Sequence, residues 1–164
     1  MRIKDYNRNK AVSYAHRWAF DRNPAYYDFT AIGGDCTNFA SQVIYAGSGV
    51  MNPTPNTGWY YYGINRRSPS WTGVLYIYNF LVKNEGIGPF GEETDVSNIE
   101  PGDIVQISFD GITFAHTPVI VHTGEVPTVN NILIAAHTFN ADNRPLSSYQ
   151  YKKLRFVHIK GVRY

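Results

Sequence analysis

Residues 33–42 read GGDCTNFASQ and contain Cys36, the only cysteine in this chain of 164 residues. Apolar side chains follow the cysteine at helical spacing, at Phe39, Ala40, Val43 and Ile44. The spacing predicts a helix from about residue 36 to residue 46, with Gly47 as its C-terminal stop. Cys36 would then lie in the first turn of this helix.

A cysteine in that position has two interpretations. Backbone N–H groups without helical partners and the positive end of the helix dipole favour the thiolate, and they can stabilise an oxyanion on an attacked carbonyl. Gly33 and Gly34 leave room for a substrate to approach the sulfur. Cys36 could therefore be a nucleophile, but it could equally be a small apolar residue of the core.

Two further helices are expected around this segment. Apolar residues recur at helical spacing over residues 8–22, and Asn23-Pro24 should end that helix because the residue before proline avoids the α region. Residues 47–73 are rich in Gly, Pro, Asn, Ser and Tyr and predict a long ordered loop. Residues 74–83 predict another helix.

The remainder of the chain predicts strands. Four segments have strand character: IVQISF (104–109), TFAHTPVIVHTG (113–124), NNILIAAHTF (130–139) and KLRFVHIKGVRY (153–164). Helices first and strands later indicate an α+β fold, in which an antiparallel sheet packs against the cysteine helix. The length suits one domain over residues 1–164.

Composition excludes several classes of protein. The chain has 15 Lys and Arg against 13 Asp and Glu, without a basic stripe, so we expect no nucleic-acid partner. No apolar run approaches the roughly 20 residues of a membrane span, and the opening MRIKDYNRNK lacks the apolar stretch of a signal peptide. One cysteine excludes an intrachain disulfide, and without an H-x-x-x-H or C-x-x-C pair we expect no metal.

A thiolate nucleophile needs a base, which is usually a histidine from another segment. His16 and His158 are best explained as structural residues. His116, His122 and His137 fall in the strands that should face the cysteine helix. His116 and His122 are six apart and would share a face of an unbroken strand, so alternation does not choose between them. His137 could neighbour His116 and orient its ring.

The quoted segments, in this order, resemble a known family. GGDCTNFASQ, PGDIVQI, AHTPVIV and ILIAAHT are similar to the bacterial Putative amidase domain family, a branch of the papain-like superfamily close to the NlpC/P60 and CHAP cell-wall peptidases. The opening YNRNKAVSYAHRWAFDRNPAYYDF and the middle segments GWYY and SPSWTGV look like the same family. The resemblance therefore covers nearly the whole chain.

The resemblance implies a papain-like (NlpC/P60-like) α+β fold and a Cys-His-polar triad. Cys36 matches the nucleophile, His116 the base and His137 the third, orienting residue. Asn140 and Asp142 follow closely in HTFNADN and are alternatives for the third position.

Neighbours of the nucleophile are implied to bind substrate. Asp35 and Thr37 flank Cys36 as in the D-C-S pattern of NlpC/P60 enzymes, where such residues help to bind a peptide amine. Asn38 and Phe39 stand where those enzymes usually have a glycine and an apolar residue, so the substrate is not carried over. Trp59 and Trp71 belong to an aromatic segment that either contacts substrate or caps the core.

The implied activity is that of a cysteine hydrolase, an amidase or endopeptidase that cleaves a peptide amide bond through a thioester, without a cofactor. We expect a monomer that acts on a peptide or peptidoglycan-like substrate, and the resemblance alone suggests an extracytoplasmic or cell-wall location. Two alternatives stay open: a catalytically silent peptide- or glycan-binding module, and an acyltransferase that uses the same Cys-His dyad.

Overall fold

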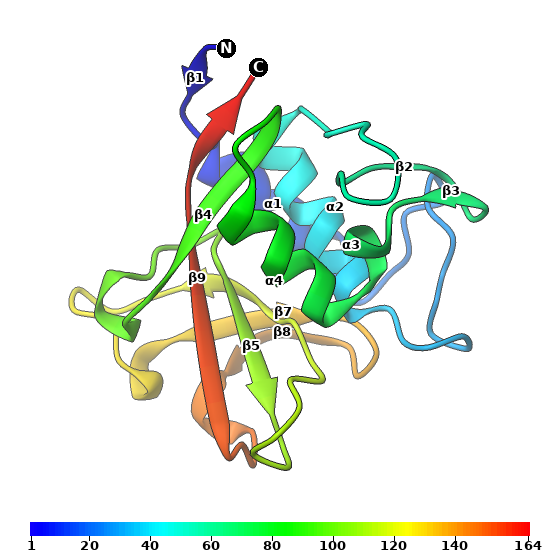
Figure 1. The fold of residues 1–164 in the computed structure, drawn as a ribbon. Helices are drawn as coiled ribbons and strands as arrows, with labels where there is room; N and C mark the ends of the chain where they lie inside the picture. Colours follow the sequence, from blue (N-terminus) through cyan, green and yellow to red (C-terminus); the bar gives the residue numbers. More distant parts are fainter.

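The computed structural model describes residues 1–164 and shows a mixed α+β fold, with the helices on one side of a curled antiparallel sheet (Figure 1). The helices are α1 (Arg8–Trp18), α2 (Cys36–Ser48), α3 (Pro69–Thr72) and α4 (Val74–Lys83). The strands are β1 (Ile3–Lys4), β2 (Tyr61–Gly63), β3 (Arg66–Arg67), β4 (Gly88–Thr94), β5 (Ile104–Ser108), β6 (Val119–His122), β7 (Leu133–Ala136), β8 (Ala141–Pro145) and β9 (Lys153–Arg163). Short 3-10 turns are η1 (Val96–Asn98), η2 (Val129–Asn131) and η3 (Leu146–Ser148).

Seven strands form the main sheet in the order β1-β9-β5-β6-β7-β8, and β4 pairs with β9 beside this path. All the pairings are antiparallel, and β9 is the longest strand, with 11 residues. Strands β2 and β3 form a separate two-stranded sheet. The antiparallel sheet packed on the cysteine helix confirms the α+β prediction.

The core has two parts because successive residues of a strand face opposite sides of the sheet. On β5, Ile104 joins the cluster of 20 buried residues that includes the helices, whereas Val105 and Ile107 join a second cluster of 10 residues. Helix α2 is buried along almost its whole length, so its first residue is anchored by the main core.

The C-terminal ends of two expected helices need correction. Helix α1 ends at Trp18 rather than near residue 22. The Trp18 carbonyl accepts a hydrogen bond from the Asp21 amide (3.2 Å) and lies 2.7 Å from Nε2 of His137. Helix α2 continues past Gly47 to Ser48, and the left-handed residue that ends it is Gly49 (φ 65°). Gly47 instead permits close packing, because a Cβ there would lie 2.3 Å from the Tyr6 ring.

The segment expected to be a loop over residues 47–73 contains β2, β3 and α3. Strands β4 and β8 have no sequence signal, because GPFGEET and ADNRP lack apolar alternation. The helix predicted over residues 74–83 is confirmed as α4, and the four predicted strand segments contain β5, β6, β7 and β9. No helix combines the length and apolar character needed to cross a membrane.

Candidate functional site

Cys36 is the first residue of α2, and Asp35 is the N-cap residue before it. Gly33 and Gly34 lead into the helix with φ values of 97° and 98°, which only glycine adopts readily. The Cys36 residue is 8% exposed, and its Sγ lies 3.8 Å from Oγ1 of Thr37. The thiol therefore lies at the start of the helix, as the spacing predicts, and it is buried there.

Burial raises the pKa of the Cys36 thiol above its ordinary value. The backbone N–H of Thr117, together with the Thr37 hydroxyl and backbone N–H, lowers this pKa by a smaller amount. The sequence suggested that the helix start would favour the thiolate, but the loss of hydration outweighs that effect. In the free protein Cys36 is a neutral thiol at neutral pH.

His116 belongs to the segment that contacts this thiol. It lies just before β6, where its carbonyl accepts a hydrogen bond from the Ile107 amide (3.0 Å), and it directly precedes Thr117. The residue is 6% exposed, and its Nε2 is buried without a hydrogen-bond partner. Burial, and then the nearby Arg144 guanidinium, lower the pKa of His116 to about 4, so the imidazole is neutral at pH 7. No hydrogen bond joins it to Cys36.

Tyr149 lies beside His116, and it was not predicted from the sequence. Its ring centroid is 5.8 Å from that of His116, and its hydroxyl is buried without a partner. The Arg144 guanidinium lies 3.7 Å from the Tyr149 ring centroid. Burial raises the pKa of the Tyr149 phenol, the Arg144 guanidinium lowers it by a smaller amount, and Cys36 raises it slightly. The chain has 13 tyrosines, and the residues next to Tyr149 do not distinguish it from the others.

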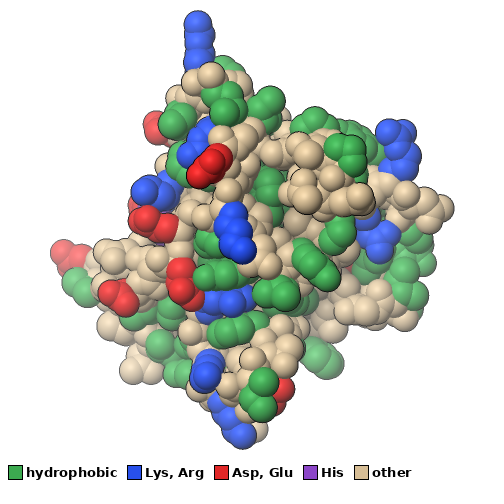
Figure 2. Space-filling view, in the orientation of Figure 1, with side chains coloured by type: hydrophobic (Ala, Val, Ile, Leu, Met, Phe, Trp, Pro, Cys, Tyr) green, Lys and Arg blue, Asp and Glu red, His purple; other side chains and the backbone are tan.

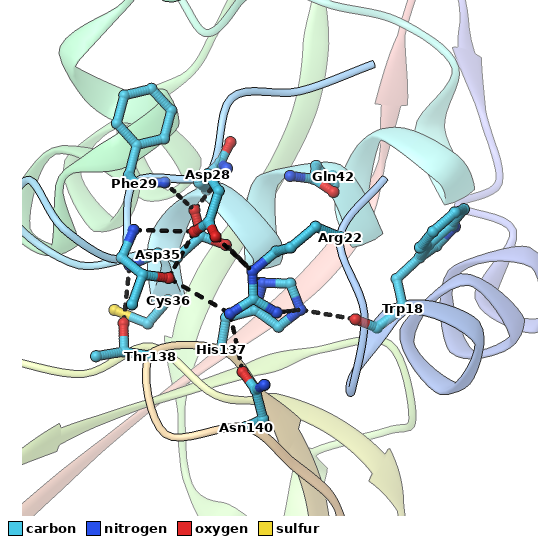
Figure 3. A network of polar contacts seen from close by, with 12 residues as sticks. Trp18, Arg22, Asp28, Phe29, Asp35, Cys36, Gln42, His137, Thr138 and Asn140 are labelled. Carbon is cyan, nitrogen blue, oxygen red and sulfur yellow. Dashed lines mark hydrogen bonds and ion pairs between the residues drawn. The ribbon is translucent and has the colours of Figure 1, made fainter. Parts of the chain in front are cut away.

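His137 occupies a different place from the one the triad prediction gives it. Its Nδ1 lies 2.5 Å from Oδ2 of Asp35, and its Nε2 lies 2.7 Å from the Trp18 carbonyl oxygen and 3.2 Å from Nη1 of Arg22 (Figure 3). Its ring stacks on Phe39 with the centroids 4.0 Å apart. Both ring nitrogens therefore have partners, and neither bonds to His116. Figure 3 also shows the Cys36 sulfur directed away from the His137 ring.

Asp35 connects three segments beside the nucleophile. Its Oδ1 accepts from the Phe29 amide (2.8 Å) and from the Asn38 side chain (2.9 Å), and its own amide donates to Thr138 Oγ1 (2.8 Å). Arg22 lies 3.6 Å from Oδ2. Because the side chain is 1% exposed and both oxygens are occupied, the Asp35 carboxylate offers no free atom to a substrate. The contacts of Asp35 are therefore with the protein's own segments.

The two alternatives for the third position bind elsewhere. Asn140 is exposed and accepts from Arg22 at 3.0 Å, and Arg22 also reaches His137, so Asn140 lies at the edge of the His137 network (Figure 3). Asp142 pairs with His16 at 2.8 Å. Among the remaining histidines, His122 is exposed at the end of β6, and His158 pairs with Asp103 at 2.8 Å.

The residues expected to bind substrate are buried. Trp59 and Trp71 are fully buried, with their ring centroids 4.7 Å apart. Their indole N–H groups donate to Ser41 Oγ and Asn38 Oδ1, both at 3.0 Å. Thr37 is 1% exposed, and its hydroxyl lies 3.3 Å from that of Thr117. Both indoles therefore pack the core, which is the second of the two roles considered for them. No group of three or more His, Cys, Asp or Glu side chains is arranged to hold a metal ion.

Comparison with known proteins places these residues in a family context. A family model described as Putative amidase domain matches residues 5–160. The chain is 34% identical over 135 residues to "Uncharacterized protein YhbB" of Bacillus subtilis (strain 168), across 79% of this chain and 42% of that protein. The chain thus spans less than half the length of this relative. No solved structure matches the chain.

Proposed function

We propose a function from one premise: the chain belongs to the Putative amidase domain family. The family name points to the hydrolysis of an amide. We propose that the protein is a cysteine hydrolase, an amidase or endopeptidase that cleaves an amide bond in a peptide, with peptidoglycan-like peptides as the substrate class. One observation carries the proposal: a buried thiol at a helix start contacts the segment that presents a neutral, unpartnered imidazole.

In this proposal His116 is the general base and Cys36 the nucleophile. A pKa of about 4 leaves the imidazole able to accept a proton throughout the neutral range. As the Cys36 sulfur attacks the amide carbonyl, the S–H proton moves to His116. The imidazolium then protonates the leaving amine, and a thioester remains on Cys36. Water, deprotonated by His116, hydrolyses the thioester and releases the acid.

The free protein is not yet arranged for this transfer, because no hydrogen bond joins Cys36 and His116. Catalytic hydrogen bonds are often long in the absence of substrate and shorten in the complex. His116 Nε2 and the Tyr149 hydroxyl are buried without partners, and the N–H groups of the first turn of α2 have no helical acceptor. These donors can stabilise the oxyanion of the tetrahedral intermediate.

In this mechanism Asp35 and His137 hold the nucleophile in position. Their contact links the residue before Cys36 to the residue after β7 and so holds the start of α2 against the sheet. The role of His137 as the third residue of a triad stays a prediction. The same holds for the relation to papain-like, NlpC/P60 and CHAP peptidases and for a cell-wall setting, which rest on the order of motifs alone.

A specific observation favours the silent binding module as the second candidate. An inactive descendant of such an enzyme would also have a cysteine with a raised pKa and no hydrogen bond between the thiol and the imidazole, as Cys36 has here. The unpaired buried atoms on His116 and Tyr149 favour the enzyme, because a site kept only for packing would gain by satisfying them.

The experiment compares the wild-type protein with Cys36→Ala on a panel of peptides and peptidoglycan fragments, with products followed by mass spectrometry. We expect the wild type to release an acid and an amine, and Cys36→Ala to release neither while keeping its circular dichroism spectrum. His122→Ala is the matched control, because that imidazole is exposed and should be dispensable. Hydrolysis by Cys36→Ala at the wild-type rate would refute the proposal. Added amine acceptors distinguish an acyltransferase, and saturable binding without turnover indicates the silent module.

A further inference from the structure

A cavity lies against α4, away from Cys36. It has a volume of about 630 Å³ and is bounded by the loop around Asn52–Thr57, by α4 and by the turn at residues 84–86. Asn52 follows the C-terminal end of α2, whereas Cys36 is the first residue of that helix. The cavity shares no lining residue with the cluster around Cys36.

The walls of this cavity are held in place by backbone hydrogen bonds. Asn52 and Trp59 bond through their main chains in both directions, at 2.9 and 2.8 Å. Across the cavity, the Asn84 side chain donates to the Ile87 and Pro89 carbonyls at 3.1 and 2.9 Å and accepts from the Gly86 amide at 2.9 Å. Such walls are preformed, so a ligand would not have to order them.

Polar side chains without partners point to a ligand. Asn52 is 9% exposed and uses its Oδ1 to accept from the Thr54 amide (3.0 Å), while its Nδ2 has no partner. The Asn79 amide and the Thr54 and Thr57 hydroxyls, which also line the cavity, make no side-chain hydrogen bond in the protein. Together they offer several neutral donors and acceptors.

An aromatic ring borders the same cavity. Tyr76 on α4 is 56% exposed, and one side of its ring packs directly over Gly73, where a Cβ would lie 2.6 Å from Cδ2. The ring is thus fixed without being covered, and Phe80 lies beside it in the lining. Lys83 and Glu85 are the two charged residues of the lining, and neither forms an ion pair. Figure 2 shows few charged side chains over this part of the surface.

We propose that this cavity binds a neutral oligosaccharide. Sugar hydroxyls both donate and accept hydrogen bonds, which matches the amides and hydroxyls, and the apolar face of a sugar ring can pack on Tyr76. An anionic ligand would need a cluster of cations, which the cavity lacks. Its lining combines polar side chains with apolar surface, including the Tyr76 and Phe80 rings, and this suits a ligand that has both polar groups and apolar faces. The inference does not depend on the chemistry of Cys36.

The test is a titration of the isotope-labelled full chain, observed by amide NMR, with a trisaccharide of N-acetylglucosamine and, separately, of glucose. We expect at least one sugar to give saturable shifts at residues 52–57 and 76–86, with none at Cys36. Tyr76→Ala should weaken binding about tenfold or more, and Asn79→Ala should also weaken it. Leu75→Ala is the matched control, because Leu75 is also 56% exposed on α4 but does not line the cavity.

Three results would overturn the inference: no saturable shift with either sugar up to about 10 mM, equal effects of Tyr76→Ala and Leu75→Ala, or shifts centred on Cys36 and His116. A tripeptide titrated in the same way must leave the cavity residues unshifted; binding of the peptide there would assign the cavity to peptides instead. Cys36→Ala should bind the sugar as the wild type does, so loss of catalysis and loss of sugar binding are separate outcomes.

Discussion

The Nδ1 atom of His137 lies 2.5 Å from Oδ2 of Asp35, and both side chains are 1% exposed. This pair joins the residue before Cys36 to the residue after β7, across 102 positions of the chain. The position of the only thiol therefore depends on a buried Asp–His contact as well as on its own helix.

Removing His137 should destabilise the protein strongly. His137→Ala leaves the Asp35 carboxylate buried without its partner, and breaking a buried pair in this way costs about 3–5 kcal/mol of unfolding free energy. Urea denaturation measures this loss. His122→Ala, which removes an exposed imidazole, should change the unfolding free energy by less than about 0.5 kcal/mol. Similar stabilities for the two variants would show that the pair does not anchor the start of α2.

The alkylation of Cys36 should be slow at neutral pH. Burial raises the pKa of this thiol, so little of the reactive thiolate is present at neutral pH. The alkylation rate should therefore increase as the pH rises through the alkaline range. Because the chain has one cysteine, mass spectrometry after iodoacetamide treatment reports this site alone. A rate already at its plateau at pH 7 would contradict the burial of the thiol. Urea-unfolded protein provides the reference rate for an exposed thiol.

His116 should link stability to pH. Its pKa falls from 6.5 in the unfolded chain to about 4 in the folded protein, so the unfolded chain binds the proton first. The associated stability is complete above pH 6.5 and is lost as the pH falls towards 4, a loss of about 3 kcal/mol. His116→Gln should flatten the dependence of the unfolding free energy on pH over this window. An unchanged slope would mean that the imidazole titrates normally.

The same imidazole should set the acidic limit of catalysis. A general base must be unprotonated, so the rate should hold down to about pH 5 and fall as the pH approaches 4. A fall centred near pH 6.5 would indicate an exposed base instead. His116→Gln should reduce kcat by about 10²–10⁴-fold.

Tyr149→Phe tests the unpaired phenol. The substitution keeps the ring that packs against His116 and Arg144 and removes only the hydroxyl. If that hydroxyl stabilises the oxyanion, kcat should fall by about 10²-fold or more with little change in KM. Tyr151→Phe, at an exposed tyrosine two residues away, is the control and should match the wild type. Equal kcat values for both variants would leave Tyr149 as a packing residue.

Some elements of the fold were predictable because their signal is local. The apolar spacing after Cys36 predicted α2, residues 74–83 predicted α4, and apolar segments with strand character predicted β5, β6, β7 and β9. Strands β4 and β8 were not predictable, since the glycine-containing GPFGEET and the polar ADNRP become strands only by pairing with β9 and β7. Tyr149 has no signal at all, because only the return of the chain after β8 brings it to His116.

The sequence by itself determined an α+β fold, a cysteine at the start of a helix and a histidine ahead of a β-strand, because helical and strand periodicity are short-range properties. Only the tertiary structure decided which groups meet: Asp35 with His137, His116 with Tyr149, and the thiol with the Thr117 amide. It also decided the charge states at the site. The cost of burying a charge depends on everything packed around it, and so Cys36 is held as a neutral thiol and His116 as a neutral imidazole.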